Sequence, residues 1–301
     1  MRTLAALGAT MALLGVLVGP TSANDLPDVR SKSVVVLDSD TGAELYGKDA
    51  DEVRPIASTT KIFVAMAVRA NKIELDAYTE ITRADAKESR GGARTRLDVG
   101  ERFKNRDLLR AMLMSSDNRA PTALGRGAGL DSDQLVAAMN KVAKQLHLKR
   151  TRFTHPSGLR GNVSTAREMA IALRAALEDP VLRDIMHDDF ETIYAKGRTR
   201  KGIGYGTTNA PLVSKRYDVI GGKTGYTKPA GYCFITAAKF GGREVLTVFL
   251  GAPSKPSRFE DFNKIAAWLD RGAPGAKIAT KRPPRAKPRL DVDARGRVAN
   301  P

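Results

Sequence analysis

Three short motifs in this sequence carry the residue types of nucleophilic catalysis: Ser58-Thr59-Thr60-Lys61, Ser116-Asp117-Asn118 and Lys223-Thr224-Gly225. Residues three positions apart lie on one face of a helix, so the Lys61 amine can reach the Ser58 hydroxyl. A neutral lysine amine is a suitable base for a serine nucleophile. A helix-capping serine followed by a solvated lysine has the same spacing. The three motifs together favour catalysis over capping.

A lysine base requires a pKa well below the ordinary value. Burial and a second nearby cation both favour the neutral amine, and Lys223 supplies that cation if the motifs converge. The dipole of a helix N-terminus contributes about 0.3–1 kcal/mol. This is small beside the roughly 10²–10⁴-fold rate gain from a positioned base. We therefore expect Lys61 to be partly buried next to Ser58.

The first part of the chain is predicted to place the first motif at the start of a helix. Two apolar runs, Ser33–Leu37 and Ala43–Tyr46, flank a polar turn and predict a β-hairpin. Apolar residues then recur at helical spacing as far as Ala70, so a helix is expected to begin at or near Ser58.

The middle of the chain reads as helical and the end as strand-rich. Segment 106–187 has mostly helical patterns, with capping candidates at residues 131–133 and a capping box at Thr165–Glu168. After about Glu191 the pattern changes to short β-rich runs, followed by a closing helix. The clearest of these elements are Tyr232–Phe240, Glu244–Gly251 and the helix Ser257–Leu269.

This order predicts an α+β fold. An antiparallel sheet built from both ends of the chain would be flanked by helices, with an all-helical lobe at about 71–187 inserted into it. A cleft between sheet and lobe is the expected site. The content of 42% hydrophobic and 28% charged residues is typical of a globular chain.

The two termini differ from the body of the chain. Residues 1–23 have a basic start, an apolar run and small residues suited to cleavage after Ala23, as in a secretory signal peptide. The catalytic domain is then expected at 24–270. Segment 271–301 is rich in Lys, Arg and Pro and is expected to be a disordered basic tail that either contacts envelope polyanions or is simply solvated.

Charge and metal-ligand counts exclude several classes of function. The formal net charge of +17 predicts attraction to polyanions, and export removes nucleic acid as the expected partner. The single cysteine and three scattered histidines permit no zinc, iron–sulfur or disulfide pattern. No metal and no organic cofactor are expected. Cys233 lies in an apolar run and is expected to be a buried small hydrophobe.

The three motifs and their order resemble those of the penicillin-binding proteins and serine β-lactamases. Longer strings resemble one branch, the low-molecular-mass D-alanyl-D-alanine endopeptidases of the penicillin-binding protein 7 type. These strings are residues 114–120, 153–159, 162–166 and 223–227. The resemblance runs from about Ser33 to Leu269. It implies a periplasmic enzyme that hydrolyses D-Ala-containing peptide cross-links of peptidoglycan and is acylated by β-lactams.

The resemblance also implies roles for individual residues. Ser58 would be the acylated nucleophile, Lys61 its base and Ser116 a proton relay, while Asn118 would bind the substrate backbone. Lys223 and Thr224 would bind a substrate carboxylate. Gly225 would allow close approach of the substrate, and the backbone N–H groups of Ser58 and Tyr226 would form the oxyanion hole. Asp117 is expected to make local hydrogen bonds within the lobe.

The same sequence features also allow other functions. A D,D-carboxypeptidase that removes terminal D-Ala from pentapeptides carries the same motifs. A β-lactamase is disfavoured, because no glutamate occurs from Arg102 to Arg167, where a deacylating residue is expected. A non-catalytic wall-binding protein is disfavoured by the intact motifs. A nucleophile at Ser157 beside His155 is weaker still, because the segment lacks the G-x-S-x-G pattern and reads as cleft wall.

Overall fold

The computed structural model describes residues 26–93, 95–198, 201–274 and 276. The expected signal peptide, and most of the expected basic tail, lie outside these residues. Within the described residues, no helix has both the length and the apolar character needed to cross a membrane.

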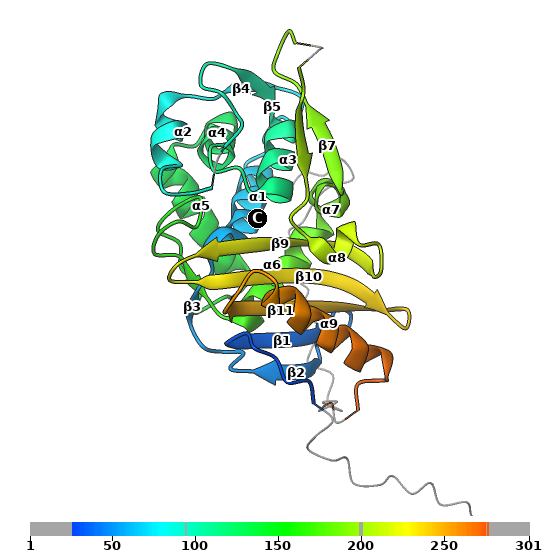
Figure 1. The fold of residues 1–301 in the computed structure, drawn as a ribbon. Helices are drawn as coiled ribbons and strands as arrows, with labels where there is room; N and C mark the ends of the chain where they lie inside the picture. The colour runs from blue at the N-terminus through cyan, green and yellow to red at the C-terminus, as the bar shows by residue number, and fades with distance from the viewer. Residues whose placement is uncertain (1–25, 94, 199–200, 275, 277–301) are drawn as a thin grey trace, which may run out of the picture.

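A five-stranded antiparallel sheet forms the base of the molecule, with strand order β2-β1-β11-β10-β9 (Figure 1). Its strands are β1 (Ser33–Asp38), β2 (Glu44–Lys48), β9 (Asp218–Thr227), β10 (Gly231–Phe240) and β11 (Arg243–Ala252). The first and last strands of the chain lie side by side as β1 and β11. The expected α+β fold with an antiparallel sheet from both chain ends is therefore confirmed.

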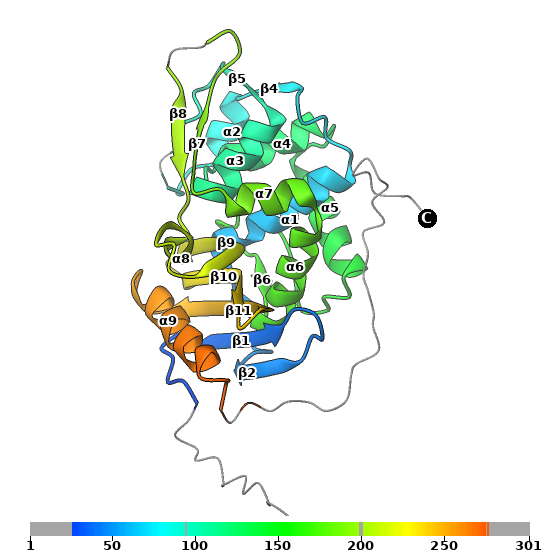
Figure 2. The same cartoon turned by 90° about the vertical axis from the view of Figure 1, so that its right-hand side faces the viewer.

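Helices cover both faces of this sheet, so its central strands are apolar on both sides. Along β1, Val34 and Val36 belong to the core under α9 (Ser257–Asp270), which includes Trp268. Val35 alternates with them and joins the larger core on the opposite face, where α6 (Ala166–Glu178) packs on β1, β10 and β11. Figure 2 shows α9 and α6 on opposite sides of the strands.

The remaining elements lie mostly above the β9 edge of the sheet in Figure 1. The helices are η2 (Ala57–Thr60, 3-10), α1 (Lys61–Ala70), α2 (Arg83–Glu88), α3 (Asn105–Ser115), α4 (Ala120–Gly127), α5 (Ser132–Gln145), α7 (Pro180–His187) and α8 (Ala210–Val213). The short strands are β3 (Arg54–Pro55) paired with β6 (Val163–Ser164), β4 (Tyr78–Glu80) with β5 (Arg102–Lys104), and β7 (Phe190–Ile193) with β8 (Ile203–Gly206).

The helical lobe differs from the expected all-helical segment at 71–187. Strands β4 and β5 form an antiparallel pair inside it, with α2 between them in sequence, and the β7–β8 hairpin packs on α3. Helix α6 lies on the sheet instead of in the lobe, because its small and apolar side chains are buried against strands as well as helices. Helical periodicity reveals that a helix exists but not which layer it covers.

Helix α1 runs through the centre of the molecule and carries the first motif. Its residues Lys61–Val68 are all buried, and it packs against α3, α4, α5 and α6. A helix that is buried all round must be apolar all round, which makes its single buried lysine exceptional. Cys233 on β10 is fully buried, as expected for a small hydrophobe.

Helix capping agrees with the sequence at one site and differs at another. Asp131 and Gln134 form a reciprocal capping box at the start of α5. At α6 the Thr165 hydroxyl accepts from the Glu168 N–H, but the other half of the expected box is missing. The Glu168 carboxylate instead accepts from the Arg150 N–H at 3.0 Å and the Thr151 hydroxyl at 2.6 Å. A tertiary contact has replaced the local one.

Candidate active site

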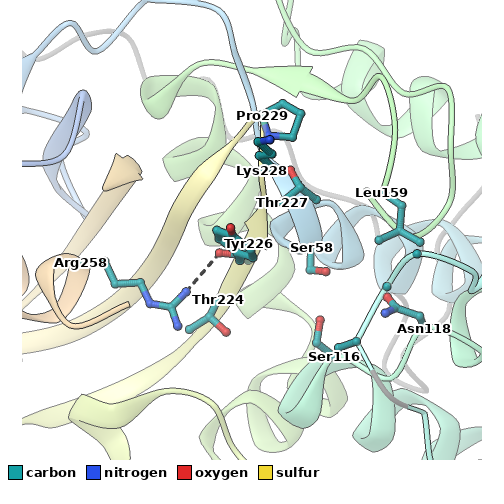
Figure 3. A pocket seen from close by; sticks show the side chains of 14 residues that line it. Ser58, Ser116, Asn118, Leu159, Thr224, Tyr226, Thr227, Lys228, Pro229 and Arg258 are labelled. Carbon is teal, nitrogen blue, oxygen red and sulfur yellow. Dashed lines mark hydrogen bonds between the residues drawn. The ribbon is translucent and has the colours of Figure 1, made fainter. Parts of the chain in front are cut away.

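Ser58 opens into a cavity of about 560 Å³ between the sheet edge and the lobe (Figure 3). It lies in the 3-10 turn η2, directly after Ala57, whose φ of 49° is in the left-handed region. A non-glycine residue in this region is strained, and such strain is concentrated at functional sites. The cavity is lined by Ser58, Gly91, Gly92, Ala93, Ser116, Asn118, Leu159, Thr224, Gly225, Tyr226, Thr227, Lys228, Pro229 and Arg258.

Lys61 connects the first two motifs through its Nζ atom. It donates to Ser58 Oγ at 2.9 Å, to Ser116 Oγ at 3.1 Å and to Asn118 Oδ1 at 2.6 Å. The contact with Ser58 follows from the spacing within one turn of helix. The contacts with Ser116 and Asn118 require the turn after α3 to lie against α1. The four side chains thus form one hydrogen-bonded group at the base of the cavity.

The charge state of Lys61 is set by its surroundings. Its side chain is 0% exposed, and burial lowers the pKa of the amine to about 7, while the negative charge of Asp117 acts in the opposite direction. Burial thus accounts for the low pKa of Lys61, and the contribution expected from Lys223 is not found there. The pKa of Lys223 itself is held well below its ordinary value by burial and by the nearby charges of Lys61 and Arg258. A substantial share of Lys61 is therefore neutral near pH 7.

Ser116 and Asn118 are placed by a reversal of the chain at the end of α3. Ser116 ends that helix in the left-handed conformation, with φ 63°, which turns the following residues toward α1. Asp117 is buried and accepts from the Arg96 N–H at 2.9 Å and the Tyr205 hydroxyl at 3.0 Å. The position of Asp117 agrees with local hydrogen bonding in the lobe.

Strand β9 forms the opposite wall of the cavity. A Cβ atom on Gly225 would lie 2.8 Å from the backbone nitrogen of Ser58, so only glycine allows this close approach. The Thr224 hydroxyl lies 2.7 Å from that of Thr208, which in turn donates to the Met114 carbonyl of α3. These contacts tie the third motif to the end of the helix that leads into the second.

Lys223 lies behind this wall. Its side chain is 1% exposed, its Nζ donates to the Thr224 carbonyl at 2.8 Å, and it is not among the residues that line the cavity. Tyr226, by contrast, is 53% exposed at the cavity, and its ring stacks on Tyr232 with centroids 4.2 Å apart.

Arg258 is a cavity residue that sequence reasoning missed. It lies in the first turn of α9, and its Nη1 donates to the Gly225 and Cys233 carbonyls at 3.1 Å each, bridging β9 and β10. Its guanidinium lies over the Tyr232 ring, and its buried Nε has no hydrogen-bond partner. An arginine at the start of a helix is usually a solvated surface residue, so the sequence carries no signal for this role.

The segment around His155 is part of the wall and does not form a second catalytic group. His155 Nδ1 accepts from the Ser157 N–H at 3.1 Å, and its Nε2 lies 3.4 Å from Glu88 Oε2. Ser157 is 2% exposed and, like His155, does not line the cavity. Leu159, two residues further along, does line it. In the described part of the chain, no group of three or more His, Cys, Asp or Glu side chains is arranged to hold a metal ion.

Comparisons with known proteins agree with this geometry. The family model described as D-alanyl-D-alanine carboxypeptidase, peptidase family S11, matches residues 20–254. A D-alanyl-D-alanine endopeptidase of Pseudomonas aeruginosa is 35% identical over 81% of this chain and 79% of its own length. A D-alanyl-D-alanine endopeptidase of Escherichia coli is 29% identical over 85% of this chain and 84% of its own length.

The fold is also that of a solved enzyme. The crystal structure of the Streptomyces K15 DD-transpeptidase has a TM-score of 0.74 and 29% identity, and the match covers 80% of this chain and 97% of that one. The family, the three motifs and the serine–lysine cavity point to the same conclusion. This chain belongs to the D-alanyl-D-alanine carboxypeptidase family of serine peptidases.

Proposed function

We propose that this protein is an exported serine D,D-endopeptidase that hydrolyses D-Ala-containing peptide cross-links of peptidoglycan. The observation that carries the proposal is the position of Lys61 Nζ, within hydrogen-bond distance of both Ser58 Oγ and Ser116 Oγ. The Lys61 amine can therefore take a proton from the Ser58 hydroxyl and pass it through Ser116 to the leaving group.

In the acylation step, Ser58 Oγ attacks the carbonyl carbon of the D-Ala residue, and its proton moves to the neutral Lys61 amine. The proton then passes through the Ser116 hydroxyl to the nitrogen of the leaving amine as the peptide C–N bond breaks. Water attacks the resulting ester, and the same groups return Ser58 to its starting state. The Asn118 amide, which lines the cavity, would bind the substrate backbone.

The wall formed by β9 suits the charged part of the substrate. Gly225 brings the strand against the Ser58 backbone nitrogen, so the N–H groups of Ser58 and Tyr226 would stabilise the oxyanion. The Thr224 hydroxyl and the Arg258 guanidinium would bind the carboxylate of the leaving residue at the cavity surface. Lys223, whose buried amine donates to the Thr224 carbonyl, would hold this wall in place from behind.

Two relatives named endopeptidases match over most of their own length and favour cleavage of cross-links. The description of the matching family as a carboxypeptidase makes removal of terminal D-Ala the second candidate. A test is to incubate the purified chain from Asn24 with cross-linked muropeptide dimers and, separately, with monomeric pentapeptides. Mass spectrometry that shows monomers formed from dimers supports the endopeptidase. Release of only D-Ala from pentapeptides would instead establish the carboxypeptidase, and Ser58→Ala is the control for both.

Covalent labelling by β-lactams is expected at Ser58, because a β-lactam carbonyl presents the same electrophile as the substrate. The label should persist on the protein. Glu168, the first glutamate after the segment 102–167, accepts hydrogen bonds from the Arg150 N–H and the Thr151 hydroxyl and does not line the cavity. Rapid hydrolysis of penicillin by the purified protein would overturn this assignment.

The two ends of the chain bear on where the enzyme acts. We infer that residues 1–23 are a signal peptide cleaved after Ala23 and that the enzyme acts in the periplasm; the mass of the protein purified from the envelope tests this. The basic segment 271–301 would contact envelope polyanions. Its deletion should weaken binding to isolated cell walls at low salt and have little effect at high salt. Equal binding of both chains at low salt would refute the contact.

A further inference from the structure

A second cavity, of about 420 Å³, lies in the helical lobe and shares no lining residue with the cavity around Ser58. Its walls come from the paired strands β4 and β5, the first turns of α3 and the segment after β7. Figures 1 and 2 both place these elements at the end of the lobe away from the five-stranded sheet. The Lys196 N–H donates to the Arg102 carbonyl at 2.8 Å, which joins the segment after β7 to strand β5.

The charged groups of this second cavity are mostly cations. They are Lys104, Arg106, Arg110 and Arg198, against the carboxylates Asp76 and Asp107. Arg110 pairs with Asp107 at 3.2 Å and with Glu191 at 3.7 Å, and Arg198 pairs with Glu101 at 2.5 Å, so these two cations already have partners. Lys104 pairs with Asp76 at 3.4 Å, but the Asp76 side chain is 75% exposed, and exposed pairs of this kind contribute little and exchange readily. The Lys104 amine is thus accessible to a competing anion.

Arg106 is the strongest indication of a ligand. Within the described residues its guanidinium has neither a hydrogen-bond nor an ion-pair partner, although it lines the cavity beside Lys104. Lys196 adds a further positive charge, with its Nζ 5.3 Å from the centroid of the Tyr78 ring. A guanidinium presents a fork of donors that matches a carboxylate.

Two tyrosine side chains in the wall of the cavity favour an organic ligand over an inorganic anion. Tyr78 and Tyr194 both line the cavity, and Tyr194 is 42% exposed. A small inorganic anion would use only the cations. An organic carboxylate would use the rings as well, because its apolar part can pack on an aromatic face while its charge meets Arg106.

We propose that this second cavity binds a carboxylate-bearing stem peptide of peptidoglycan, apart from the peptide that is cleaved. The inference rests on the proposed function, because a polymer with a stem peptide at every repeat can occupy both cavities together. Binding at a second site raises the effective concentration of cleavable bonds at the first. Activity on the polymer should therefore depend on Lys104 and Arg106, whereas activity on small substrates should not.

The binding test uses the full mature chain with Ser58 acylated by penicillin, confirmed by mass, so that the catalytic cavity is blocked. A disaccharide tetrapeptide is titrated in low salt and followed by calorimetry. The double variant Lys104→Gln/Arg106→Gln should weaken binding about tenfold or more, as expected for the loss of two charge-assisted contacts. The control Lys141→Gln/Lys144→Gln removes the same charge from the exposed side of α5 and should bind as the wild type.

Titrations with two other ligands identify which chemical group the second cavity recognises. The same muropeptide with its carboxylates amidated should bind about tenfold more weakly, and inorganic phosphate should not displace the unmodified ligand at equal concentration. The proposal would be overturned if the amidated muropeptide bound as tightly as the unmodified one. It would also be overturned if the two double variants lost the same amount of affinity. Displacement by phosphate would also overturn it and reveal a general anion site.

The catalytic test compares two substrates of the unblocked enzyme. Lys104→Gln/Arg106→Gln should release products from intact sacculi several-fold more slowly than the wild type, at an unchanged rate on isolated dimers and with an unchanged Tm. Unchanged release from sacculi would refute the proposal. Failure of the proposed function has a different signature, namely no activity of the wild type on any substrate. Binding to the second cavity could then still be measured with Ser58→Ala.

Discussion

Protonation of Lys61 should control how fast Ser58 is acylated, and lowering the pH is the perturbation that tests it. Burial lowers the pKa of the Lys61 amine to about 7 from 10.5, against the opposing charge of Asp117. Only the neutral amine can accept the Ser58 proton. The acylation rate should therefore rise with pH through about 7 and level off above it.

The size of the effect follows from this pKa. About half of Lys61 is neutral at pH 7 and about 1% at pH 5, so acylation should slow about 50-fold between these values. A solvated lysine with a pKa of 10.5 would be neutral in only about one molecule in 3000 at pH 7. Burial thus raises the population of the base by roughly three orders of magnitude.

The assay is stopped-flow acylation by a fluorescent penicillin at saturating concentration, from pH 5 to pH 9. Saturation separates the chemical step from binding of the penicillin carboxylate, which we assign to Thr224 and Arg258. Lys61→Arg, which keeps a cation and removes the base, should remain unlabelled over the whole range. A flat profile in the wild type, or a midpoint above about pH 9, would refute the assignment of Lys61 as the base.

Three further predictions concern single substitutions. Arg258→Gln should raise KM for a carboxylate-bearing substrate about tenfold or more with little change in kcat, because a charge-assisted contact is lost in binding. An equal rise in KM for the same substrate with its carboxylate amidated would contradict this. Gly158→Ala should lower the free energy of unfolding by about 3 kcal/mol or more in excess of the loss in the control Gly241→Ala. Both glycines have positive φ, but only at Gly158 would a Cβ atom lie 2.0 Å from the Ala57 carbonyl oxygen. Equal Tm values of the two variants would refute the clash. In the wild type the unfolded chain binds the Lys61 proton more tightly than the folded chain, so the free energy of unfolding should rise by about 3–4 kcal/mol between pH 7 and pH 10 because of Lys61. Urea titrations of Lys61→Met should lack this rise. Parallel pH profiles of the wild type and the variant would show that the pKa of Lys61 is not lowered in the folded chain.

The sequence pattern predicted correctly those elements whose structure depends on residues close together in the chain. The hairpin of β1 and β2, the start of the helix near Ser58 and the closing helix α9 all lie close to their expected bounds. The half-formed capping box at Thr165 and the pairing of β4 with β5 inside the lobe were not foreseen. Both depend on partners that are remote in sequence, such as the Arg150 N–H that binds Glu168.

The sequence by itself determined the catalytic residue types and the pairing of Ser58 with Lys61, because their spacing places both on one turn of helix. Only the tertiary structure decided the charge state of Lys61, since its pKa falls to about 7 because the packing around α1 buries the amine. The same holds for the wall of the cleft, where Lys223 turns inward and Arg258 of α9 reaches the cavity. Burial and contact between distant segments arise from packing, and no local pattern encodes them.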